Sequence, residues 1–116
     1  VKYDLEALRE KFPKKSLAGR PPTLWRYLEL LPVRDRKKII SLAETITPIL
    51  DARRLGAHFG VQELLIKDES RLPTGSFKAR GMTAAVSMAH QFGLKKLAVP
   101  SAGNAAGALA ACTLTR

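Results

Sequence analysis

Apolar residues at helical spacing mark the amino-terminal third of the chain. In residues 3–12 they repeat at intervals of three and four behind Asp4, a residue type that suits a helix start. A second short helix is expected in residues 21–32, opened by prolines and closed by Pro32. Both helices have the pattern of packing elements. Residues 1–43 are therefore interpreted as a helical amino-terminal segment.

The pattern changes in the second half, where short apolar runs alternate with longer helical stretches. Strands are expected at residues 63–67 and 95–99, and residues 76–92 between them carry apolar side chains at helical spacing. An alanine-rich helix follows from about Ala105. Such alternation predicts the α/β fold class, with parallel βαβ units and right-handed crossovers. Residues 44–116 are interpreted as the start of this α/β domain, truncated at its carboxyl end.

Composition indicates one small globular unit and the charge of its partners. Of the 116 residues, 46% are hydrophobic and 26% are charged, which is typical of a folded domain. Twenty Lys and Arg against ten Asp and Glu give a net charge of +10, which favours anionic partners such as phosphorylated metabolites. The basic residues are scattered and the aromatic residues are few, so nucleic acid is not an expected partner.

Cysteine content and hydropathy define the expected compartment. Cys112 is the only cysteine, which excludes an internal disulfide and a multi-thiol metal cluster. His58 has no second ligand at metal-binding spacing, so no metal site is expected. No run of apolar residues reaches the roughly 18 needed to cross a membrane, and the first residues lack a signal-peptide pattern. A cytoplasmic protein without a membrane partner is expected.

One loop is built around a lysine. In "RLPTGSFKARG", residues 71–81, Pro73 and Gly75 shape a turn that ends just before Lys78. The predicted topology places this loop at the carboxyl end of a strand, where ligands collect in open α/β sheets. Lys78 would then lie in the first turn of a helix. A helix start with a lysine that merely reaches solvent is the alternative for this stretch alone.

A second loop, "PSAGNAAG" in residues 100–107, offers polar groups at the same expected edge. The Ser101 hydroxyl, the Asn104 amide and several backbone N–H groups suit a carboxylate or another small anion. A helix whose small residues allow tight packing is the alternative for this stretch. The two loops together, about 25 residues apart on consecutive βα units, favour a shared site.

Both loops resemble those of a known enzyme family. "IKDESRLPTGSFKARG" followed by "VPSAGNAAGALAA" is similar to the threonine synthase family of pyridoxal-phosphate enzymes, of fold type II and the tryptophan synthase β-like group. The resemblance covers roughly residues 44–111. The family often has Asp at the position of Ala79. The resemblance implies that this α/β catalytic domain is a partial fold type II enzyme.

The resemblance also implies roles for individual residues. Lys78 would be the catalytic residue that links covalently to pyridoxal 5'-phosphate, with Phe77 packed beside the cofactor. Asn104 would bind both the cofactor's ring oxygen and, with neighbouring loop groups, the substrate. The substrate carboxylate would be held by the loop formed by Ser101, Ala102, Gly103 and Asn104.

The reaction implied by the resemblance is the conversion of O-phospho-L-homoserine and water into L-threonine and phosphate. The family's cofactor phosphate loop and pyridine-nitrogen partner would lie beyond Arg116, so the 116-residue chain alone is expected to be inactive. A homodimer is the candidate assembly of the full-length protein. A threonine or serine dehydratase, or a non-catalytic remnant of such an enzyme, remains the alternative to a threonine synthase.

Overall fold

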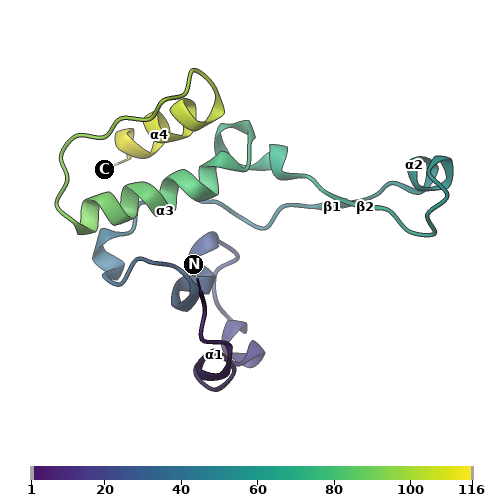
Figure 1. The fold of residues 1–116 in the computed structure, drawn as a ribbon, viewed down its shortest axis with the longest axis horizontal. Coiled ribbons are helices and arrows are strands. Elements are labelled where there is room, and N and C mark those ends of the chain that lie inside the picture. The colour runs from purple at the N-terminus through teal and green to yellow at the C-terminus, as the bar shows by residue number, and fades with distance from the viewer. Residues whose placement is uncertain (1, 116) are drawn as a thin grey trace.

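The computed structural model describes residues 2–115 and is mostly helical. Figure 1 shows a pair of helices, a long thin arm that projects from one end of the pair, and an amino-terminal segment beneath them. In chain order, with η denoting a 3-10 helix, the elements are α1 (Leu5–Lys11), η1 (Lys14–Leu17), η2 (Leu24–Leu30), η3 (Arg36–Lys38), β1 (Ile49–Asp51), α2 (Arg53–His58), β2 (Leu65–Lys67), η4 (Glu69–Arg71), η5 (Pro73–Gly75), α3 (Lys78–Gln91) and α4 (Asn104–Leu114).

The hydrophobic core lies where α3 and α4 pack against each other. Its centre is formed by Ile40, Val86 and Cys112, with partly buried Met82 and Leu109 around them. The expected helices at residues 76–92 and from about 105 are confirmed: α3 buries Val86 and Ala89 among others, and α4 buries Ala108 and Cys112. Both helices begin at the same end of the pair and run in the same direction (Figure 1).

The arm is an antiparallel hairpin that carries a short helix at its tip. Strand β1 pairs with β2 so that Ile49 lies opposite Lys67 and Asp51 lies opposite Leu65. The six-residue helix α2 joins the two strands. All six strand residues are exposed, so backbone hydrogen bonds rather than side-chain burial hold the hairpin.

The predicted parallel sheet is wrong. The expected strand at residues 63–67 is present as the shorter β2, but its partner is the preceding strand β1 and the pairing is antiparallel. Residues 95–99 have no regular secondary structure. Leu97 and Val99 instead line an apolar hollow with Val86 of α3. An apolar run usually signals burial, but here residues 95–98 stay exposed and only Val99 is partly buried.

The amino-terminal segment is attached to the rest by side-chain packing at Ile40 and by hydrogen bonds. Helix α1 begins as expected at Asp4, whose carboxylate accepts a hydrogen bond from the Ala7 N–H. The second expected helix is the 3-10 helix η2, which is kinked at Tyr27. An isolated bridge between Thr23 and Thr45 joins this segment to the stretch that leads into the hairpin. In residues 2–115 no helix combines the length and hydropathy needed to cross a membrane.

Candidate functional site

The loop before Lys78 is a tight turn that sets the start of α3. Thr74 and Gly75 both have positive φ, 66° and 68°, a conformation that glycine adopts readily and threonine rarely. The Gly75 N–H donates to the Leu72 carbonyl at 2.9 Å. Ser76 then returns to an extended, buried conformation, and its hydroxyl accepts from the Lys78 N–H at 3.4 Å. Lys78 is consequently the first residue of α3.

The Lys78 side chain is half-buried and lies against an aromatic ring. Its Nζ is 4.4 Å from the centroid of the Phe77 ring, a cation–π distance. Within residues 2–115 the amine has no hydrogen-bond acceptor and no carboxylate partner. Phe77 itself is 59% exposed. The amine and the ring thus lie together at the start of α3.

The second loop ends at the amino terminus of α4. The Ser101 hydroxyl accepts a hydrogen bond from the Gly103 N–H at 3.2 Å, and no side chain caps the helix. Asn104, the first helical residue, is exposed, as are Ala102 and Gly103. Because the first N–H groups of a helix lack intrahelical acceptors, this loop can donate to an anion.

The fold brings the two loops to one end of the helix pair. Lys78 and Asn104 are the first residues of α3 and α4, which begin at the same end (Figure 1). The turn η5 also packs against α4. This neighbourhood arises from helix packing and not from the parallel sheet expected from the sequence.

An ion-pair network behind Lys78 is a feature that the sequence did not indicate. The Glu69 carboxylate accepts from the Arg80 guanidinium at 2.7 Å and from the Thr47 hydroxyl. Arg80 also donates to the Thr45 carbonyl at 2.9 Å. The Arg80 guanidinium, then the Thr47 hydroxyl, lower the pKa of Glu69 from its usual 4.5 to about 2. This network joins the first turn of α3 to the segment before β1.

Residues next to this network are also held by local hydrogen bonds. The Asp68 carboxylate accepts from the Ser70 N–H at 3.1 Å and from the Arg71 guanidinium at 3.2 Å. The Ser70 hydroxyl is the main reason why the pKa of Asp68 is lowered. The charged stretch that follows β2 is thus folded back on itself before the turn at Pro73–Gly75.

A carboxyl group is buried under the helix pair. The Glu44 side chain has no exposed surface and accepts hydrogen bonds from the Leu42 N–H at 2.6 Å and the Ser41 hydroxyl at 2.9 Å. Burial, and then the Glu44 charge, raise the pKa of the Cys112 thiol to about 11. Cys112 is accordingly a core residue and not a nucleophile. Within residues 2–115 no group of three or more His, Cys, Asp and Glu is placed to hold a metal ion.

The part of the chain that holds the lysine turn and the start of α4 matches a known family of enzymes. Residues 40–114, more than half of the chain, match the family of pyridoxal-phosphate-dependent enzymes. The chain belongs to this family. Both loops described above lie within the matched residues.

The most similar relatives include several threonine synthases. The chain is 43% identical over 109 residues to threonine synthase from Methanocaldococcus jannaschii, covering 94% of this chain and 27% of that protein. It is 37% identical over 110 residues to threonine synthase from Methanosarcina acetivorans, covering 95% of this chain and 26% of that protein. The chain spans about a quarter of the length of these relatives. No solved structure matches it.

Proposed function

We propose that this chain is the amino-terminal part of a threonine synthase that converts O-phospho-L-homoserine and water into L-threonine and phosphate. The observation that carries the proposal is that Lys78 and Asn104 begin two helices at the same end of one packed pair. The identity to threonine synthases over nearly the whole chain supports this substrate over that of a dehydratase.

The residues present suit pyridoxal 5'-phosphate. The unpaired Lys78 amine is the group that an aldehyde-bearing cofactor requires, and the exposed Phe77 ring offers an apolar face beside it. The Asn104 amide at the start of α4 offers a hydrogen bond to a polar ring substituent. When bound, the cofactor supplies an electron sink for carbanions formed on the substrate.

The chain's own residues would bind substrate and move protons. The Ser101 hydroxyl and the N–H groups of residues 102–104 would hold the substrate carboxylate, since a helix start favours an anion. The Lys78 amine, once released from its covalent link, would accept and return a proton at the substrate carbon. The Arg80–Glu69 pair, at 2.7 Å, would keep the first turn of α3 in place during these transfers.

The experiment is a comparison of lysine variants in the full-length parent. Lys78→Ala is expected to abolish the cofactor's visible absorbance in the protein and to lower threonine formation from O-phosphohomoserine by at least about 10²–10⁴-fold. Lys95→Ala, which removes an equal charge from the exposed segment after α3, is the matched control and should leave both unchanged. A parent that deaminates threonine and does not use O-phosphohomoserine would instead be a dehydratase.

A further inference from the structure

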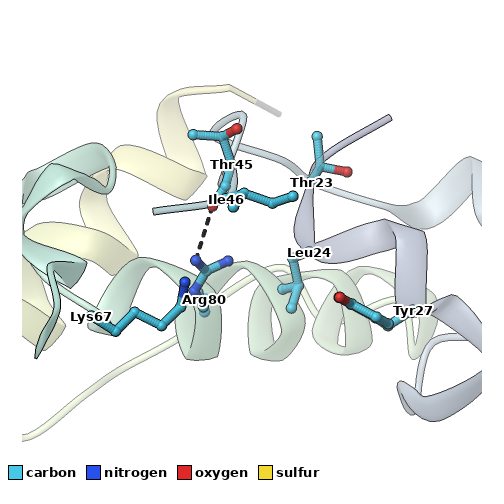
Figure 2. Close-up of a pocket in the computed structure, with 7 residues that line it drawn as sticks. All are labelled: Thr23, Leu24, Tyr27, Thr45, Ile46, Lys67 and Arg80. Atoms are coloured by element: carbon cyan, nitrogen blue, oxygen red, sulfur yellow. Dashed lines mark hydrogen bonds between the residues drawn. The ribbon is translucent and has the colours of Figure 1, made fainter. Parts of the chain in front are cut away.

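A pocket separate from the two loops lies between the amino-terminal segment and α3. It has a volume of about 320 Å³, within the range of small-molecule sites. Its apolar lining comes from Leu24, Tyr27 and Ile46, and its charged lining comes from Lys67 and Arg80 (Figure 2). Charge is thus concentrated in two side chains of a largely apolar hollow.

The two cations share one carboxylate, so the pocket keeps a positive charge. Glu69 Oε2 lies 2.7 Å from Arg80 Nε, and Glu69 Oε1 lies 4.0 Å from Lys67 Nζ. Two cations and one carboxylate give a net charge of one positive unit. Lys67 is held at the site by a 3.1 Å hydrogen bond to the Thr47 carbonyl, while half of its side chain stays exposed. A second anion would offset the remaining charge.

Both cations retain hydrogen-bond donors. The Arg80 guanidinium donates through Nε and Nη2, and in residues 2–115 its Nη1 has no acceptor. The Lys67 ammonium has three N–H groups, and within the same residues one has a hydrogen-bond acceptor. The two groups lie close together at one end of the pocket, as expected from their shared contact with Glu69 (Figure 2).

This pocket is distinct from the site proposed at Lys78. Arg80 follows Lys78 by two residues in α3, and residues two apart in a helix point about 200° apart around its axis. The lining of the pocket includes neither Lys78 nor Asn104. A ligand here would therefore lie across the first turn of α3 from the Lys78 amine.

We propose that this pocket binds a small organic carboxylate with an aliphatic group. Its carboxylate would accept hydrogen bonds from Arg80 Nη1 and Lys67 Nζ, a geometry that favours a planar anion. Its aliphatic group would pack on Leu24, Ile46 and the Tyr27 ring, replacing water at apolar surface. The proposal does not depend on the function proposed for Lys78.

The test titrates the 116-residue chain with butyrate, followed by the backbone amide signals of Ile46 and Lys67 at constant ionic strength. Saturable shifts are expected, with acetate and phosphate binding more weakly than butyrate. Lys67→Gln should lower the affinity for butyrate about tenfold, because it removes one charge-assisted hydrogen bond. Lys95→Gln, with the same charge change on an exposed segment, should bind butyrate as the parent chain does.

A second variant isolates the apolar contribution. Ile46 is 55% exposed, so the Ile46→Ala variant should fold normally. It should lower the affinity for butyrate about threefold and leave the affinity for acetate unchanged. The proposal would be overturned if the amide shifts rose linearly with butyrate concentration or if chloride reproduced them. Equal changes in Lys67→Gln and Lys95→Gln would also overturn it. Phosphate binding more tightly than butyrate would overturn it too, and retained binding in Lys78→Ala would separate this site from the cofactor chemistry.

Discussion

The helix pair and the hairpin arm use opposite means to hold their structure. In α3 and α4, Ala79, Thr83, Val86 and Ala108 are at most 1% exposed. In β1 and β2 every residue is exposed, although the backbone pairing is regular. The pair is therefore stabilised by side-chain packing, whereas the arm relies on the backbone ladder, and a lone two-stranded hairpin is marginal in water.

The turn that carries Lys78, the residue proposed to be catalytic, belongs to the packed region. Leu72, Ser76 and Ala79 are buried on either side of the Lys78 turn, and the turn itself packs against α4. Buried neighbours fix the backbone of this lysine, which the proposed covalent link to a cofactor would require. The difference between the two regions thus predicts where substitutions will be costly.

The largest expected difference comes from one substitution made in both regions. Ile40 is 6% exposed in the core beneath α3, whereas Ile49 is 62% exposed in β1. Ile40→Ala should lower the free energy of unfolding by about 2–5 kcal/mol, because it leaves a cavity among packed side chains. Ile49→Ala should change it by less than about 0.5 kcal/mol. Urea denaturation of the two variants measures both values, and equal losses would refute the contrast between the regions.

A smaller effect is expected from a buried hydroxyl in the pair. Ser87 has no exposed surface, accepts from the Ile40 N–H at 2.8 Å and donates to the Thr83 carbonyl at 2.6 Å. Ser87→Ala should cost about 1–3 kcal/mol in unfolding free energy, because the buried Ile40 N–H loses its acceptor.

The matched control is Ser70→Ala, since Ser70 is exposed after β2 and hydrogen-bonds to Asp68 there. Its effect on unfolding free energy should stay within about 0.5 kcal/mol, because water can replace the lost hydroxyl. Losses of similar size in the two serine variants would show that burial of Ser87 does not set its contribution.

The helices and the lysine turn were predictable because their signals are local. Residues 78–91 carry apolar side chains at helical spacing, residues 104–114 are rich in alanine, and Pro73 and Gly75 mark the turn before Lys78. The pairing of strands is a non-local property. The apolar run at residues 95–99 did not specify whether a strand would pair with it, and residues 95–98 stay exposed in the structure, which is why the parallel sheet was wrongly predicted.

The network at Glu69 was beyond prediction for the same reason. Glu69 and Arg80 are 11 residues apart, and the turn at Pro73–Gly75 brings them together. Glu44 gave no signal either, since carboxyl groups usually lie at the surface. Its burial depends on the turn at Ser41, where Ala43 adopts a φ of 60°.

The smallest predicted effect concerns the network that joins the two regions. The folded-state pKa of Glu69 is about 2, below its usual 4.5, so the folded chain binds fewer protons than the unfolded chain between these values. The stabilisation is therefore complete above about pH 4.5 and is lost as the pH falls towards 2. Because the pair is partly exposed, its contribution should be below about 1 kcal/mol.

Arg80→Met tests this contribution directly, because it removes the main cause of the lowered pKa. The Glu69 carboxylate, followed by NMR, should then titrate closer to 4.5. The matched control is Arg20→Met, since Arg20 holds the Glu29 carboxylate at a pKa of about 2 in the amino-terminal segment. That variant should raise the pKa of Glu29 and leave that of Glu69 unchanged. An unchanged pKa of Glu69 in Arg80→Met would contradict this prediction. Lys67 and Thr47 would then be sufficient to keep the carboxylate ionised, and the link between the arm and α3 would not depend on Arg80.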